Sequence, residues 1–104
     1  GQKKIASLSS GLGSITNLSW AGKYGYCASK AGLNMVSKGL AEWLKSENII
    51  VISLSPGWTR TAMGGPHATN SAEESVSGMR HVISGLTLAE TGRFWNFDGE
   101  EVPW

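Results

Sequence analysis

The sequence is poor in cysteine and has no long apolar run. Cys27 is the single cysteine among 104 residues, which excludes an internal disulfide and is typical of a protein from a reducing cytoplasm. A membrane-spanning helix needs ~20 consecutive apolar residues, whereas the longest apolar stretch, residues 49–52, has only the length of a strand. We therefore expect a cytoplasmic protein without a membrane partner.

The sequence also lacks a large excess of either positive or negative charge. Nine Lys and Arg side chains against eight Asp and Glu give a formal net charge of +1. The lysines are scattered and form no basic stripe, so a nucleic-acid partner is not expected. The length suffices for one domain with a modest core. The chain opens at Gly1 without an initiator Met, and we expect a piece cut from within a larger protein, or a mature fragment.

Hydrophobic periodicity predicts three strands alternating with two helices. Residues 5–9, the β-branched run 49–54 and residues 92–97 are typical of strands, and the second has the composition of a strand buried on both faces. Helical spacing of apolar residues predicts a helix over residues 26–45, and a second one follows a capping-box pattern that begins at Ser71. This order predicts an α/β fold with a parallel sheet.

Within the first predicted helix, we expect the core to be contacted by a stripe of apolar residues, namely Leu33, Val36, Leu40 and Leu44. Gly32 and Gly39 weaken the helix and could allow close packing against a neighbouring element. The segments 10–25 and 58–69 are predicted loops, and they are longer than most connections, which favours a functional role.

Tyr26 and Lys30 stand four residues apart near the start of the first predicted helix, so they share one helix face. A phenol can protonate the alkoxide left by carbonyl reduction, but its ordinary pKa is about 10. A neighbouring ammonium favours the phenolate and lowers that pKa. Ser10 follows the first strand, at the sheet edge where α/β folds bind ligands, and could hold the carbonyl oxygen. The pattern predicts a carbonyl or alcohol oxidoreductase.

Three segments in this order and spacing resemble the short-chain dehydrogenase/reductase family. They are residues 5–11 (IASLSSG), 26–34 (YCASKAGLN) and 55–61 (SPGWTRT). The likeness runs along nearly the whole chain, and its details look most similar to the C-factor and Sniffer-like carbonyl-reductase branch. The resemblance implies a Rossmann-like, doubly wound parallel sheet. Residues 1–104 would be the C-terminal half of that single domain, and the N-terminal dinucleotide-binding half, with its Gly-rich loop, would be absent.

The resemblance also implies roles for individual residues. Tyr26 would be the general acid/base, Lys30 would lower its pKa and bind the nicotinamide ribose, and Ser10 would orient the substrate carbonyl. The cofactor would be NAD or NADP, the substrate a small carbonyl compound or alcohol, and the whole protein a homo-oligomer. The cofactor would be contacted by Tyr26, Lys30, Pro56, Gly57, Thr59 and Thr61. Ala62 departs from the family pattern, since many relatives carry Asp there.

Several alternatives stay open at this point. Ser9 competes with Ser10 as the catalytic serine, whereas Tyr24 has Ala28, not a lysine, four residues on. Trp58, Met63 and Met79 could line a substrate pocket or belong to the core. His67 and His81 are too far apart to predict a metal pair. A Ser-His-Asp hydrolase using His81 and Asp98 would lack the usual Gly-x-Ser-x-Gly elbow.

Two rival hypotheses belong to other classes. The chain could be a noncatalytic binding or signalling module that retains the back half of the fold. In that case an exposed sheet edge would favour self-association. It could also be a truncated product without a stable fold.

Overall fold

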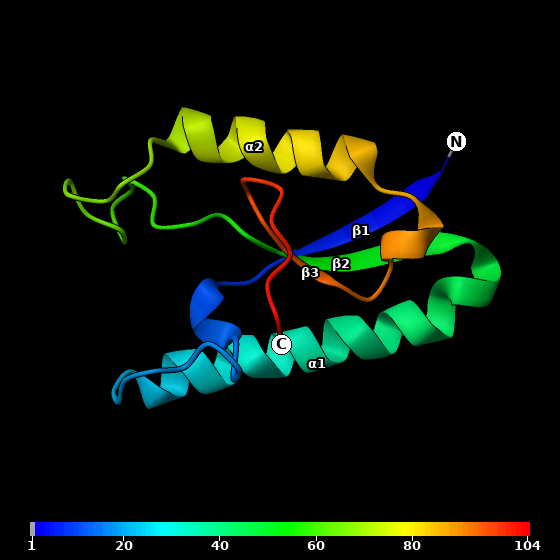
Figure 1. Cartoon of the computed structure of the whole chain (residues 1–104), viewed down its shortest axis with the longest axis horizontal. Coiled ribbons are helices and arrows are strands. Elements are labelled where there is room, and N and C mark those ends of the chain that lie inside the picture. Colours follow the sequence, from blue (N-terminus) through cyan, green and yellow to red (C-terminus); the bar gives the residue numbers. More distant parts are fainter. Residues whose placement is uncertain (1) are drawn as a thin grey trace.

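Three parallel strands and two long helices make up the fold. A computed structural model describes residues 2–104. The elements follow in the order β1 (Lys3–Leu8), α1 (Tyr24–Leu44), β2 (Ile49–Ser55), α2 (Ala72–Gly85) and β3 (Phe94–Asn96), and three short 3-10 helices lie at Gly11–Gly13, Lys45–Glu47 and Leu88–Glu90 (Figure 1). This confirms the predicted alternation of strands and helices.

The sheet has the order β1-β2-β3 and is parallel throughout. Lys3 pairs with Ile49 and Leu8 with Leu54, so β1 and β2 run side by side over their full common length. The much shorter β3 begins opposite Ser53. The central strand β2 has a strand on each side and a helix over each face. Its side chains are therefore buried, as its continuous β-branched sequence predicts.

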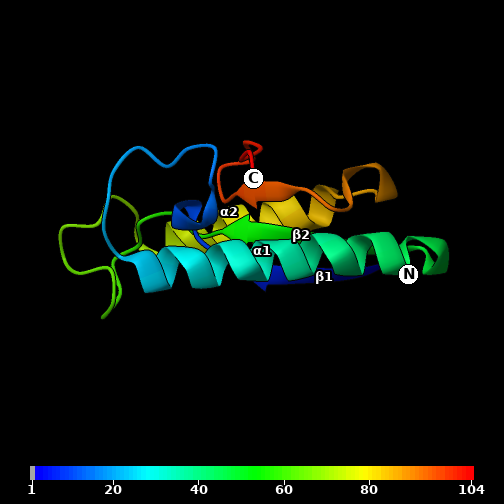
Figure 2. The same ribbon diagram turned by 90° about the horizontal axis from the view of Figure 1, so that it is seen from below.

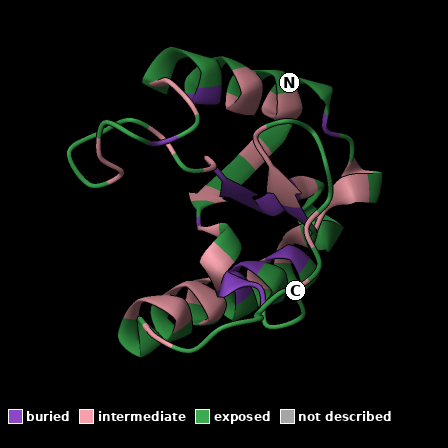
Figure 3. Cartoon of the chain, turned by 60° about the vertical axis from the view of Figure 1, so that its left-hand side comes forward, coloured by how far each residue is buried: buried purple, intermediate pink, exposed green. Residues whose placement is uncertain are grey.

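The two long helices cover opposite faces of the sheet. Figure 1 and Figure 2 both show β2 between α1 and α2. Alternate residues of β2, namely Ile50, Ile52 and Leu54, form a core cluster with Leu86 and with partly buried residues of α2. Figure 3 shows the buried residues gathered on the central strand and on the inner side of α1, while much of β1 is exposed. No helix within residues 2–104 is long and apolar enough to cross a membrane.

The inner face of α1 differs from the predicted one. Its buried residues are Asn34, Ser37 and Ala41, whereas Val36 of the expected apolar stripe is 59% exposed. The predicted core stripe was therefore wrong at Val36, while Leu33, Leu40 and Leu44 are half-buried. Small side chains on the inner face let the helix approach β2 closely, and larger apolar residues are left on the flanks and outside.

The glycines that permit close packing are also not the predicted ones. A Cβ atom built on Gly32 or Gly39 would meet nothing within 4 Å. One on Gly13 would lie 3.0 Å from the Cβ of Lys30, and one on Gly78 would lie 2.4 Å from the carbonyl oxygen of Phe97. Gly13 thus lets the first 3-10 helix lie against α1, and Gly78 lets α2 lie against the turn after β3.

The start of α2 carries the predicted capping box. The Ser71 hydroxyl accepts a hydrogen bond from the Glu74 backbone N–H over 3.1 Å, and the Ser71 N–H donates to the Glu74 carboxylate over 3.3 Å. These bonds hold the pKa of Glu74 below its ordinary value. The first helix begins two residues earlier than predicted, at Tyr24, and its N-cap Lys23 makes no capping bond through its side chain.

Candidate functional site

A cavity of ≈ 850 Å³ opens at the carboxyl ends of the strands. In open parallel sheets this edge is where ligands bind, because the loops that follow each strand meet there. Every predicted site residue except Lys30 lines the cavity. The lining residues are Ser9, Ser10, Gly11, Leu12, Lys23, Tyr26, Ser55, Pro56, Gly57, Trp58, Thr59, Thr61, Met63, Gly64, Ala72, Ser75, Val76, Met79 and Asn96.

Tyr26 and Lys30 lie on the same side of α1, as their spacing predicts. The Lys30 Nζ is 5.8 Å from the centroid of the Tyr26 ring. It also donates a hydrogen bond to the carbonyl oxygen of Leu8, the last residue of β1, over 3.2 Å. Lys30 therefore lies beside Tyr26 without lining the cavity itself, and two of its three N–H donors remain free of hydrogen bonds to the described protein atoms.

Ser10 and Ser9 reach the cavity in different ways. The Ser10 hydroxyl accepts a hydrogen bond from the Leu12 N–H over 3.1 Å, so its own proton is free to be donated. The Ser9 backbone N–H donates to the carbonyl oxygen of Leu54, which continues the pairing of the first two strands. The Ser9 hydroxyl is buried and has no hydrogen-bond partner among the described residues. Both serines line the cavity, and the choice of Ser10 as the catalytic serine stays a prediction.

The C-terminal tail holds the segment after Ser10 in place. The Ser14 hydroxyl donates to the carbonyl oxygen of Pro103 over 2.5 Å, and the Ile15 N–H donates to that of Trp104 over 2.6 Å. The Trp104 ring stacks on buried Phe94 of β3 with the centroids 5.4 Å apart. The end of the chain therefore fixes the loop that carries the predicted catalytic serine to the sheet.

The loop after β2 forms the opposite wall of the cavity. Gly57 has φ +74°, and a Cβ there would lie 2.7 Å from the Phe97 ring, so both conformation and space require glycine. The Thr59 hydroxyl is within 3.1 Å of the carbonyl oxygens of Pro56 and Gly57. The Ser75 hydroxyl donates to the Pro56 carbonyl over 2.7 Å, which ties the loop to α2. The wall is therefore shaped by its own hydrogen bonds.

The rest of this loop, residues 58–70, leaves the sheet and returns to it. The Arg60 N–H donates to the carbonyl oxygen of Asn70, and the Asn70 N–H donates to that of Trp58. These backbone hydrogen bonds join the two ends of the loop. At the tip, the Thr61 hydroxyl accepts from the Gly64 N–H over 3.2 Å. A Cβ on Gly64 would lie 1.8 Å from the Thr59 carbonyl oxygen. Only glycine lets the tip fold back over the wall.

Some lining residues were not predicted from the sequence. Ser55 and Asn96 are the last residues of β2 and β3, and the rule that ligands bind at strand ends could have indicated them. Lys23 and Leu12 carry no such signal, because they reach the cavity only through the path of the loop between β1 and α1. Trp58, Met63 and Met79, which the sequence left undecided, line the cavity.

The hydrogen-bonding groups at the cavity suit the sugar and amide of a nicotinamide nucleotide. In the lining, the Thr61 hydroxyl retains its own proton while accepting from Gly64, and the Ser9 hydroxyl has no partner among the described residues; beside the lining, Lys30 has spare N–H donors. The Gly11–Gly13 helix is only three residues long, so it does not supply the helix N-terminus that holds a pyrophosphate. Within residues 2–104, no three His, Cys, Asp or Glu side chains are grouped to hold a metal ion.

A parallel sheet covered by helices, with a serine, a tyrosine and a lysine at its carboxyl edge, defines a class of protein. The family model described as short chain dehydrogenase matches residues 2–72. The chain therefore belongs to the short-chain dehydrogenase family, as its sequence resemblance implies.

Two curated relatives show how the chain relates to whole proteins of the family. It is 42% identical to the C-signal of Myxococcus xanthus over 98% of this chain and 61% of that protein. It is 30% identical to the 1-hydroxy-2-glutathionyl-2-methyl-3-butene dehydrogenase of Rhodococcus sp. (strain AD45) over 97% of this chain and 46% of the other. The chain thus spans about half the length of these relatives.

Solved structures confirm the fold. The carbonyl reductase Sniffer of D. melanogaster superposes with a TM-score of 0.94 at 38% identity, covering 97% of this chain and 41% of that one. The NADPH-bound carbonyl reductase from chicken fatty liver superposes with a TM-score of 0.90 at 34% identity, covering 97% and 42%. The Rossmann-like architecture predicted from the sequence is therefore correct for the described part of the chain.

Proposed function

We propose that this chain carries the proton-transfer and substrate-binding part of an NAD(P)-dependent carbonyl reductase. The observation that supports this most directly is the meeting of Ser10, Tyr26 and the Pro56–Gly57 wall at one cavity, with the Lys30 Nζ 5.8 Å from the centroid of the tyrosine ring. The similarity to carbonyl reductases, one of them NADPH-bound, supports the same reaction class. In this proposal residues 1–104 are the C-terminal half of one Rossmann domain.

Each residue has a stated role in the proposed reaction. The Ser10 hydroxyl donates a hydrogen bond to the substrate carbonyl oxygen and orients it. When bound, a reduced nicotinamide supplies hydride to the carbonyl carbon. Tyr26 then gives its phenolic proton to the oxygen, and the Lys30 ammonium stabilises the negative charge that develops on the phenol. In the alcohol direction the same groups act in reverse.

The nicotinamide end of NAD or NADP would be held by residues on both sides of the cavity. Lys30 and Tyr26 would contact the ribose. The Pro56–Gly57 wall, the backbone at Thr59 and the Thr61 hydroxyl would contact the ring and its carboxamide. The pyrophosphate and adenosine would need a Gly-rich turn from another part of the protein, since the described glycine-rich segment after β1 forms only a short 3-10 helix.

A chimeric enzyme tests the proposal. Residues 2–104 would replace the matching segment of the D. melanogaster carbonyl reductase, and NADPH oxidation would be followed with a panel of ketones and aldehydes. We expect turnover, with kcat reduced by a factor of about 100 to 10,000 in Tyr26→Phe. Tyr24→Phe is the matched control, because Tyr24 is 74% exposed and does not line the cavity. A folded chimera that binds NADPH without turnover, or equal effects of the two substitutions, would contradict the proposal.

The open edge of β1 favours a second candidate, a binding or signalling module. Within residues 2–104, β1 pairs with β2 on one side only, and both Ile5 and Leu8 are substantially exposed. Unpaired N–H and C=O groups on such an edge can accept a further strand. The Myxococcus relative is itself called a C-signal. In this reading the retained half of the fold would act through protein contact rather than catalysis.

A further inference from the structure

The charge inside the candidate cavity comes from one side chain. Across the lining residues that the structure describes, Lys23 alone carries a formal charge, and there is no Asp, Glu, Arg or His. The other walls offer hydroxyl groups and the apolar side chains of Leu12, Trp58, Met63 and Met79. A carboxylate entering this cavity would meet one cation and no competing anion.

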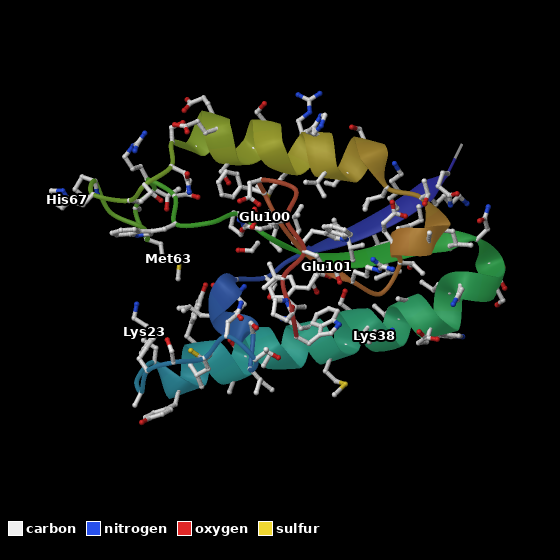
Figure 4. All side chains as sticks on the ribbon, in the orientation of Figure 1. Lys23, Lys38, Met63, His67, Glu100 and Glu101 are labelled. Atoms are coloured by element: carbon white, nitrogen blue, oxygen red, sulfur yellow. The ribbon has the colours of Figure 1, made fainter. Side chains whose placement is uncertain are left out.

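The backbone holds Lys23 at the mouth of the cavity. It is the N-cap of α1 and adopts the left-handed conformation, with φ 47°. Its carbonyl oxygen accepts a hydrogen bond from the Cys27 N–H over 2.9 Å, which fixes this conformation at the first turn of the helix. Figure 4 shows Lys23 reaching up from the start of α1 and Met63 reaching down from the loop toward the same opening.

Lys23 also differs from several other basic residues in that it forms no ion pair with a described acidic side chain. No salt bridge within residues 2–104 includes it, and the first turn of α1 contains no acidic residue. By contrast, Arg60 of the opposite loop forms an ion pair, with its Nη2 3.8 Å from the Glu74 Oε1. Its Nη1 also donates a hydrogen bond to the carbonyl oxygen of Ala68. The Lys23 ammonium can therefore bind an anionic ligand without first breaking an ion pair.

We propose that Lys23 is a specificity residue that selects carbonyl compounds carrying a carboxylate remote from the reacting carbonyl. This inference rests on the proposed function, because it takes Tyr26 as the position of the carbonyl oxygen. Three residues of helix rise about 4.5 Å, so Lys23 and Tyr26 lie roughly one helical turn apart. A substrate whose carbonyl and carboxylate are separated by an aromatic ring has the length to reach both, and its ring would lie against the apolar wall at Trp58 and Met63.

Binding of a matched pair of ligands tests the inference. The isotope-labelled 104-residue chain would be titrated with para-acetylbenzoate and with para-acetylbenzamide, which differ in charge but hardly in shape. Amide signals of the cavity wall, at Gly57, Thr59 and Gly64, report binding. We expect the carboxylate to bind roughly fivefold more tightly, as for a largely exposed ion pair. We also expect high salt to reduce this preference.

Two substitutions separate Lys23 from general electrostatics. Lys23→Gln should remove the preference for the carboxylate while the amide compound binds as before. Lys38→Gln is the matched control, because Lys38 is also on α1 but forms an ion pair with Glu42 away from the cavity. The spectrum of each variant without ligand shows that it is folded.

The outcomes distinguish this inference from the proposed function. Equal affinity for the two ligands, or a preference that survives in Lys23→Gln, would overturn the role of Lys23 and leave the reaction class standing. If neither ligand shifts the wall signals, the inference about Lys23 fails, while the reaction class is decided separately by turnover of the chimeric enzyme. A preference lost equally in Lys38→Gln would show that overall charge, not Lys23, attracts the carboxylate.

Discussion

Lys30 on α1 donates a hydrogen bond from its Nζ to the backbone carbonyl oxygen of Leu8, the last residue of β1, over 3.2 Å. The same ammonium is 5.8 Å from the centre of the Tyr26 ring. One side chain therefore joins the end of a strand to the helix that carries the proposed acid/base. This contact explains how the tyrosine is held at the carboxyl edge of the sheet.

Replacing Lys30 by Met should lower the free energy of unfolding by about 1 kcal/mol, the usual net contribution of one hydrogen bond. Because the Met side chain keeps most of the apolar stem, the loss of stability measures the contribution of the ammonium group. Lys38→Met is the control, and it should change stability by less than about 0.5 kcal/mol because it removes only an exposed ion pair. Urea unfolding measures both, and equal effects would show that the bond to Leu8 contributes nothing.

Replacing Ser71 by Ala should destabilise the chain by about 1 kcal/mol, because it removes the N-cap bond to the Glu74 N–H. Ser77→Ala, on the exposed side of the same helix, changes the same atoms without touching a cap. It should be neutral or slightly stabilising, since Ala has the higher helix propensity. Thermal or urea unfolding checks both variants. A similar loss in Ser77→Ala would mean that helix composition, not the cap, is responsible.

The capping box should also make stability depend on pH. Hydrogen bonds from Ser71 hold the folded-state pKa of Glu74 below the ordinary value of 4.5. The unfolded chain therefore binds the proton first, so this contribution is complete above pH 4.5 and is lost as the pH falls through the folded-state pKa. Wild type should lose more stability between neutral and acidic pH than Glu74→Gln does. Glu73→Gln, which leaves the box intact, should follow wild type.

Replacing Gly78 by Ala should cost about 1–3 kcal/mol, the usual range for overpacking. The new Cβ would lie 2.4 Å from the Phe97 carbonyl oxygen, which is backbone and cannot move aside alone. Gly32→Ala, in α1, places its Cβ in open space and should instead stabilise by up to about 1 kcal/mol. Opposite signs for two Gly→Ala changes in helices would confirm that α2 packs closely on the turn after β3. Two stabilising changes would contradict it.

The exposed edge of β1 predicts self-association that increases with concentration. Ile5 is 42% exposed there, and a charged residue on an edge strand opposes pairing with another chain. Ile5→Lys should therefore shift the chain toward monomer in size-exclusion chromatography with light scattering. Trp43→Lys, at an exposed position on the outside of α1, is the control for general surface hydrophobicity. Wild type that stays monomeric at high concentration would argue against the edge as a contact.

Much of the fold could be predicted because the signals are local. The β-branched run of β2, the capping box at Ser71 and the helical spacing after Tyr26 each depend on neighbouring residues, and the structure confirms all three elements. The side of α1 that contacts the sheet was predicted only in part, because Val36 of the expected stripe is exposed and the fully buried residues were not foreseen. Its small residues Asn34, Ser37 and Ala41 are buried because close approach to β2 outweighed the apolar stripe, and periodicity alone does not contain that information.

The sequence by itself determined the order of strands and helices and indicated most residues of the candidate site. Tyr26 and Lys30 share a face because a helix has a fixed pitch, and Ser10 follows a strand. Only the tertiary structure decided which distant side chains meet at the cavity. Lys23 and Met63 face one opening because of the paths of two long loops. Those paths depend on contacts between residues far apart in the chain, such as Ser14 with Pro103, which no local pattern encodes.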